Sequence, residues 1–244
     1  DTNNKLSINL KGDYMKEIDL AYFPIIGRGE QINIICAIHG IKVNNLISTP
    51  MGDDFDKDKQ APFGTVPWMK DHSNGLELND SLAIIQYLVS KYEGPLTPKT
   101  HEDAAHVAMY WSWVQDYYSY VLSPLHDIIT DHSDPFWRNL RLTDTLAEGG
   151  KETGIANLTT LHTKRIAYLE RLLEQSNSSP FLTGSNCSYA DIFLYTSVRT
   201  VQKTPGFGIL RDACNGDPFS DCPIILNVCE EVSKIDHVIK TVGS

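Results

Sequence analysis

The chain has 244 residues, 41% of them hydrophobic and 21% charged, a composition typical of a globular protein with one large or two small domains. Its formal net charge of −10 and its pI near 5.2 argue against nucleic acid or an anionic membrane as a partner, because their phosphates would repel it. No apolar run approaches the roughly 18 residues that a transmembrane helix needs.

The first predicted elements are a strand over 17–23 and a helix over 30–40, whose apolar residues recur at helical spacing up to a terminating glycine. A turn broken by proline and glycine separates them. It places Tyr22 at the carboxyl end of the strand and Arg28 at the start of the helix. Ligands of open α/β sheets bind at the carboxyl ends of the strands, so both residues are candidates for a ligand-binding site.

The following segments complete a small α/β domain. They read, in order, as a strand over 41–48, a polar stretch over 49–64, hairpin strands over 66–70 and 76–78, and a helix over 79–92. A βαβ unit followed by ββα is the layout of a thioredoxin-like domain. We expect this domain to span 17–93, with a linker of two prolines and a glycine over 94–100.

The rest of the chain, 101–244, is predicted to be an all-helical domain. Helical periodicity covers 101–129 (with a bend near Pro124), 157–176, 188–202 and 223–235, whereas 131–150 is irregular. Ser188 and Asp191 have the spacing of a capping box, in which the serine hydroxyl and the acid side chain each accept a backbone N–H. We interpret these two residues as structural.

The five cysteines show no CxxC pair and are odd in number, which favours reduced thiols and a cytoplasmic location. A bridge between Cys214 and Cys222 is the alternative. The eight histidines show no metal-ligand spacing, so we expect no metal.

Three landmarks of the first domain point to a ligand. Where thioredoxin-like domains present a cysteine, this chain has Tyr22, which excludes disulfide exchange. Pro67, just before a strand, is a candidate for a cis peptide, which would turn the backbone of Val66 outward to hold an extended peptide. Asp80 and Ser81 start a helix, where backbone N–H groups attract carboxylates. Together these features predict a pocket for a short peptide with a free amine and carboxylate.

With these motifs the chain resembles the soluble glutathione S-transferases of the tyrosine type, nearest the sigma class, which includes glutathione-dependent prostaglandin D synthases. The matching motifs are YF-x3-GR-x-E (22–30), PFG-x-VP (62–67), DSLAI-x-x-YL (80–88), AHV-x7-QDYY (105–118) and S-x-A-D (188–191). The resemblance covers about 17–240. The extension over 1–16 and the irregular segment over 131–150 are unusual for the class. Because the sequence starts at Asp1, a removed leader or tag stays open.

The resemblance implies roles for individual residues. Tyr22 would donate its phenolic hydrogen bond to the glutathione sulfur, and Arg28 would add positive charge nearby. The remaining glutathione contacts would come from Phe55, Lys59, Thr65, Val66, Pro67, Asp80, Ser81 and, across a homodimer interface, Asp116. The walls of the electrophile pocket would include Phe23, Ile25, Gly27 and Tyr118, and Phe63 would be an aromatic key inserted into the partner.

Several of these positions depart from the family pattern. Phe55 stands near the usual tryptophan but lacks an indole N–H, and Lys59 is one position away from the usual basic residue. Thr65 replaces a lysine or glutamine, Asp80 replaces a glutamine, and Asn33 replaces a frequent arginine. These changes bear mainly on how the glycyl carboxylate would be held.

The chemistry explains why a tyrosine and an arginine are needed. A free thiol has a pKa near 8.5, and the thiolate is the nucleophile. Lowering the pKa by two units takes about 2.7 kcal/mol, which one charge-assisted hydrogen bond and a nearby cation can supply. We therefore expect an enzyme that conjugates glutathione to hydrophobic electrophiles. A glutathione-dependent isomerase of the prostaglandin D synthase kind and a non-catalytic carrier or structural protein with the same fold stay open.

Overall fold

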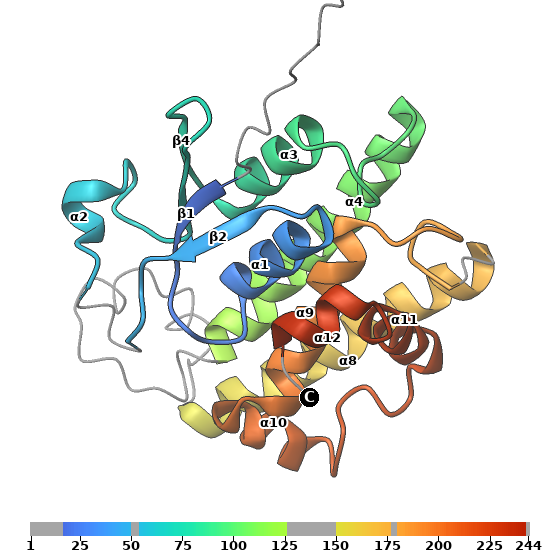
Figure 1. The fold of residues 1–244 in the computed structure, drawn as a ribbon. Coiled ribbons are helices and arrows are strands. Elements are labelled where there is room, and N and C mark those ends of the chain that lie inside the picture. Colours follow the sequence, from blue (N-terminus) through green and yellow to red (C-terminus); the bar gives the residue numbers. More distant parts are fainter. Residues whose placement is uncertain (1–16, 50–53, 126–149, 177–179, 243–244) are drawn as a thin grey trace, which may run out of the picture.

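The computed structural model describes residues 17–49, 54–125, 150–176 and 180–242 (Figure 1). The expectations for the extension over 1–16, and for the irregular segment apart from Gly150, fall outside these ranges. The described part has the predicted fold class: a thioredoxin-like domain with a four-stranded sheet, followed by an all-helical domain.

The sheet has the strand order β2-β1-β3-β4, with β1 parallel to β2 and antiparallel to β3. The strands are β1 (Glu17–Ala21), β2 (Lys42–Asn45), β3 (Trp68–Asp71) and β4 (Glu77–Asn79). Helix α1 (Arg28–Ile38) connects the parallel pair β1 and β2, and α3 (Ser81–Lys91) follows the β3–β4 hairpin. β1 is central, so the residues that follow it emerge in the middle of the sheet edge.

Successive side chains of β1 and β3 point to opposite faces of the sheet, and each face packs into a core of its own. Leu20 and its neighbour Met69 are buried with α1 and α3 in the main core, which continues into the helical domain. The next pair along the two strands, Ala21 and Trp68, points to the other face of the sheet and belongs to a small second core that also contains Phe55. Two of its members, Phe55 and Ala61, flank the short helix α2 (Lys57–Gln60).

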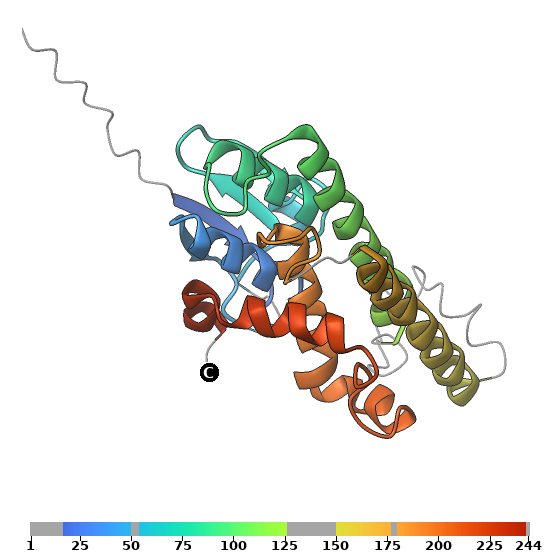
Figure 2. The same cartoon turned by 90° about the vertical axis from the view of Figure 1, so that its right-hand side faces the viewer.

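In the helical domain, α9 (Tyr189–Lys203) lies at the centre and packs against α1, α4 (His101–Tyr117) and α11 (Pro223–Ser233) (Figure 1). The long helices α4 and α8 (Lys151–Ser176) lie next to each other at one side of the molecule (Figure 2). The remaining short helices are η2 (Pro205–Phe207), α10 (Gly208–Ala213) and α12 (Asp236–Val242), of which α12 packs on α1.

Element boundaries differ from the prediction in instructive places. α1 starts at Arg28 rather than residue 30, and β1 ends at Ala21, so Tyr22 lies in the connecting turn. The long helix changes at Tyr118–Leu122 into a π-helical turn, directly ahead of Pro124. Proline has no N–H to donate to the preceding turn, which favours such a change of helical type just before it.

Two local predictions are confirmed. The Val66–Pro67 peptide is cis. The capping box is present: Asp191 Oδ2 accepts the backbone N–H of Ser188 at 2.8 Å, and its Oδ1 accepts the N–H of Leu182 at 2.7 Å. Burial raises the pKa of Asp191, and these hydrogen bonds oppose that effect.

All five cysteines are free in the structure, so the alternative of a Cys214–Cys222 bridge is wrong. Cys36, Cys222 and Cys229 are buried. Burial raises the pKa of Cys222 to about 11, which keeps this thiol protonated and unreactive at neutral pH.

Candidate active site

The site is built around the hydroxyl group of Tyr22, at the turn between β1 and α1. The backbone N–H of Arg28, the first residue of α1, donates a hydrogen bond to Tyr22 Oη over 3.3 Å. The tyrosine oxygen is thus held at the N-terminus of an 11-residue helix, where the helix dipole is positive. Because the N–H occupies a lone pair of the oxygen, the phenolic proton stays available for a ligand.

Gly29 makes this position possible. A Cβ atom at Gly29 would lie 2.3 Å from the ring and 2.6 Å from the Cβ of Tyr22, distances that no side chain tolerates. Gly27 is the second close neighbour, since a Cβ there would lie 3.0 Å from Tyr22 Oη and 3.7 Å from Tyr118 Oη. Gly29 therefore leaves room for the ring of Tyr22, and Gly27 for the hydroxyls of Tyr22 and Tyr118.

The surroundings keep Tyr22 in its neutral form. Burial and then the neighbouring Tyr118 raise the pKa of Tyr22 well above 10, while the N–H and the guanidinium of Arg28 lower it by less. A protonated phenol at neutral pH is a hydrogen-bond donor, not a base. It can stabilise an anion placed beside it.

Arg28 and Tyr118 line the cavity beside Tyr22. The Arg28 guanidinium carbon lies 5.2 Å from the centroid of the Tyr118 ring, a cation–π contact. Tyr118 is the first residue of the π-helical turn and also contacts the Phe193 ring of α9, with centroids 6.0 Å apart. The change in helical type thus lies at the site itself, as π-turns frequently do.

These groups line a cavity of about 250 Å³. Its walls are Tyr22, Phe23, Arg28, Lys57, Gly64, Thr65, Val66, Tyr118 and Ser123. The nine residues come from four separate segments of the chain, and six of them were predicted as site residues. Lys57, Gly64 and Ser123 were not.

Asn79 holds the loop that carries Thr65 and Val66. Its side-chain Nδ2 donates to the carbonyl oxygens of Thr65 at 2.8 Å and Pro67 at 3.0 Å, and its Oδ1 accepts the N–H of Phe63 at 3.2 Å. The backbone of Val66 makes no hydrogen bond within the described part of the chain. The sequence offered one signal for Asn79, a polar residue that ends a strand next to the Asp80–Ser81 pair.

Asp80 and Ser81 lie at the start of α3, as predicted, but outside the cavity walls. Asp80 has a φ of 77°, and its Oδ1 caps the helix by accepting the N–H groups of Leu82 at 2.9 Å and Ala83 at 3.4 Å. The Ser81 hydroxyl is buried and has no hydrogen-bond partner among the described residues.

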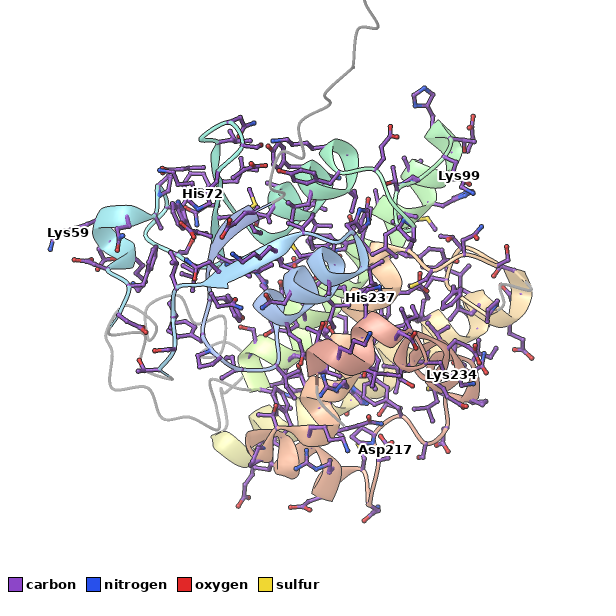
Figure 3. The ribbon with its side chains drawn as sticks, viewed as in Figure 1. Lys59, His72, Lys99, Asp217, Lys234 and His237 are labelled. Atoms are coloured by element: carbon purple, nitrogen blue, oxygen red, sulfur yellow. The ribbon has the colours of Figure 1, made fainter. Side chains whose placement is uncertain are left out.

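Phe55 and Lys59 do not line the cavity. Phe55 is buried against Trp68, with ring centroids 5.5 Å apart, in the second core. Lys59 extends outward from α2 (Figure 3), 82% exposed, and pairs with Asp56 at 2.8 Å. Lys57, two residues earlier on the same short helix, is the basic residue that reaches the cavity wall.

The other predicted residues are spread more widely. Ile25 is exposed in the β1–α1 turn and lines a different cavity, and Gly27 is buried beside the Tyr22 hydroxyl. Asp116 is exposed on α4, and Phe63 is 73% exposed beside the cavity loop. Their predicted roles need a bound ligand or a second subunit.

Among the described residues there is neither a candidate metal site nor a candidate membrane span. No group of three or more potential ligand side chains could hold a metal ion. Within the same ranges, none of the helices has the length and hydropathy needed to cross a membrane.

Comparison with family models matches both halves of the chain to one family. Residues 29–96 match the model described as "Glutathione S-transferase, N-terminal domain" and residues 130–239 the model described as "Glutathione S-transferase, C-terminal domain". Two similar proteins are a glutathione S-transferase of Dirofilaria immitis and glutathione S-transferase D7 of Drosophila melanogaster. They are 24% and 26% identical, over 75% and 77% of this chain and 76% of each relative.

Solved structures share the fold over nearly the whole chain. NaGST-2 superposes with a TM-score of 0.68 at 24% identity, covering 93% of this chain and 98% of that one. Na-GST-3 of the hookworm Necator americanus, described as monomeric, gives 0.66 at 19% over the same shares. A rat hPGDS complexed with a quinoline gives 0.65 at 21%, covering 92% and 94%.

Proposed function

The chain belongs to the glutathione S-transferase family, and we propose that it is a tyrosine-type, sigma-like enzyme that conjugates glutathione to small hydrophobic electrophiles. The observation that carries this proposal is the hydrogen bond from the Arg28 N–H to Tyr22 Oη. It leaves the phenolic proton free to point at a sulfur in the cavity. A role in detoxification follows from this reaction.

The proposed mechanism is stabilisation of the glutathione thiolate. Tyr22 donates a charge-assisted hydrogen bond worth about 1.5–3 kcal/mol to the sulfur anion. The Arg28 guanidinium and the N-terminus of α1 add positive potential on the same side. Together these terms reach the roughly 2.7 kcal/mol needed to lower the thiol pKa by two units. The thiolate then attacks the electrophile and displaces its leaving group.

Glutathione would lie along the loop that Asn79 holds. The free backbone groups of Val66 pair with the cysteinyl unit, as they would with an added strand. Lys57 is the cation we assign to the glycyl carboxylate, in place of Lys59, because it lines the cavity. The buried, unpartnered Ser81 hydroxyl and the Asp80 carboxylate receive the γ-glutamyl end.

We further propose a homodimer in a reducing compartment, the cytoplasm. Free cysteines support the compartment, because an oxidising one favours bridges. Exposed apolar side chains support a dimer interface. They are Met109 of α4, Tyr120 in the turn after it, Tyr168 and Leu172 of α8, and Phe63. Asp116 is exposed on α4 too, and reaches the partner's ligand in this arrangement.

Retention on immobilised glutathione followed by turnover of 1-chloro-2,4-dinitrobenzene tests the function. We expect retention and turnover, with turnover lowered in Tyr22→Phe and unchanged in Tyr87→Phe, a tyrosine of α3 that does not line the cavity. Retention without turnover would favour a carrier. Turnover of a prostaglandin endoperoxide without conjugation would favour an isomerase, which uses the same thiolate.

A further inference from the structure

Strand β2 is an outer strand of the sheet, and its free edge carries backbone groups without partners. The N–H of Leu46 donates to the carbonyl oxygen of Leu20 in β1 over 2.9 Å, and backbone groups point alternately to either side along a strand. The N–H and C=O groups of Val43 and Asn45 therefore point away from β1. They make no hydrogen bond within the described part of the chain. An open edge of this kind is a template for a further strand.

The two faces of β2 differ in polarity. Val43 packs against the main core, on the side of the helices, and is half-buried. Lys42 lies on the opposite face, where it forms an ion pair with Glu17 over 3.0 Å. Asn44, on that same face, donates to Asp19 over 2.8 Å. A strand that extends the sheet here needs apolar side chains on one face and polar or basic side chains on the other.

A segment with this pattern precedes β1, within the residues 1–16 that lie outside the described ranges. In KLSINLK (5–11), the apolar residues Leu6, Ile8 and Leu10 alternate with polar ones, and a lysine stands at each end. Alternation with a period of two is typical of a strand with one buried face. The segment over 6–10 is one residue longer than β2.

The start of β1 lies where this segment can reach the free edge. Glu17, the first residue of β1, is opposite Lys42, the first residue of β2, because the two strands are parallel. The far side of β2 is two strand spacings from β1, or roughly 10 Å. The connecting residues 11–16 span up to about 20 Å when extended. A chain that turns back over this distance runs antiparallel to β2.

We propose that residues 6–10 of the chain's own extension add to the sheet as a fifth strand, antiparallel to β2. Leu10 then lies opposite Val43. Ile8 lies opposite Asn45, and each pair exchanges two backbone hydrogen bonds. Directly opposite residues share a face, so the apolar side chains of the segment extend the main core, and its lysines lie on the face of the acidic residues of β1. The extension thereby covers an edge at which another chain would otherwise pair.

Amide hydrogen exchange, measured by NMR on the full chain without any ligand, tests the pairing. The N–H groups of Val43 and Asn45 should be protected in the wild type. They should exchange at least tenfold faster in Ile8→Pro, because proline has no N–H to donate. Thr2→Pro, outside the proposed strand, is the matched control and should leave this exchange unchanged. The N–H of Asn44, which points to β1, is the internal reference and should exchange equally in all three proteins.

Nuclear Overhauser contacts identify the copy that provides the strand. Contacts between the methyl groups of Leu10 and Val43 should appear within one chain, and should be absent between chains in a mixture of labelled and unlabelled protein. Wild-type Val43 and Asn45 that exchange as fast as in Ile8→Pro would overturn the proposal. Methyl contacts found only between chains would also overturn it, and would assign the edge to a second copy. Glutathione takes no part in either measurement, so the result is independent of the proposed function.

Discussion

Tyr22 owes its position to the absence of a side chain at Gly29. The ring of Tyr22 fills the space that a Cβ of residue 29 would need, so the glycine is a condition for the site rather than a flexible hinge. Close approach of this kind is one of the few uses of glycine that a sequence read alone does not distinguish from a turn.

Gly29→Ala should therefore displace Tyr22 and lower kcat about tenfold or more, with a loss of about 1–3 kcal/mol of stability from overpacking. Steady-state kinetics and urea unfolding measure the two effects. Gly208→Ala is the control, since a Cβ there would lie 3.5 Å from its nearest neighbour, an ordinary contact. If Gly29→Ala were as active as the wild type, the tyrosine would not be the positioned group.

Asn79 is a positioning residue whose effect should appear in glutathione binding. Asn79→Asp keeps the acceptor for the Phe63 N–H but places a charge beside the carbonyls of Thr65 and Pro67. We expect the KM for glutathione to rise about tenfold, or about 1.4 kcal/mol, with a smaller change in kcat. A variant that lost kcat and kept its KM would contradict this role.

A network of hydrogen bonds around a buried carboxylate lies at the end of the sheet far from the turn of Tyr22. Asp71 ends β3 and is fully buried, where Lys91 donates to its Oδ2 at 2.8 Å, Tyr92 at 2.7 Å and Tyr87 at 2.8 Å. Burial raises the pKa of Asp71. The hydrogen bonds from Lys91, Ser73, Tyr92 and Tyr87 lower this pKa by more than burial raises it, so it lies well below its usual value. The network ties α3 to the hairpin.

A depressed pKa contributes its full stability where the acid is ionised in both the folded and the unfolded chain. The contribution of Asp71 is therefore complete above about pH 5, declines as the pH falls below about 4, and is lost only as the pH falls through the depressed pKa of the folded state. Asp71→Asn should lower the free energy of unfolding by about 2–4 kcal/mol at pH 7, and this difference should shrink toward pH 3. Urea unfolding at a series of pH values measures both.

Glu77→Gln is the matched control on the next strand, because its pair with Lys70 is exposed and should contribute less than about 1 kcal/mol. A difference between Asp71→Asn and wild type that stayed constant down to pH 3 would show that the carboxylate charge is not what stabilises the hairpin.

The strands and long helices could be predicted because each carries a repeating apolar pattern. The elements that were missed, such as α2, α10 and the π-helical turn, are too short for a period to show. The place of Lys57 in the cavity wall was missed for the same reason. Residues two apart on a helix point in different directions, but no pattern predicts a helix of four residues.

For the protein as a whole, the two halves of the site come from different domains. Tyr22 and Arg28 belong to the first domain, and Tyr118 to the second. The buried ion pair between Glu30 and Arg199 joins α1 to α9 just behind the turn. The resemblance implied the place of Tyr118 in the site, but no pattern in the sequence predicted the pair of Glu30 and Arg199, because the two residues are far apart in the chain.

Phe63 should decide the assembly state. Because its ring is 73% exposed, Phe63→Ser should convert a dimer into a monomer of 27.3 kDa, whereas Ile239→Ser, at an exposed isoleucine of α12, should not. Analytical ultracentrifugation distinguishes the two masses. A wild type that sediments as a monomer would remove Asp116 from the proposed glutathione site.

The account depends most directly on the ionisation of bound glutathione. Ultraviolet titration of the thiolate in the complex should give a pKa about two units below the value near 8.5 of a free thiol. In Tyr22→Phe, the pKa of the bound thiol should return most of the way to the value of the free thiol. A bound thiol that ionises at the same pH as in buffer, or one whose pKa is equally low in Tyr22→Phe, would contradict the central role of this hydroxyl.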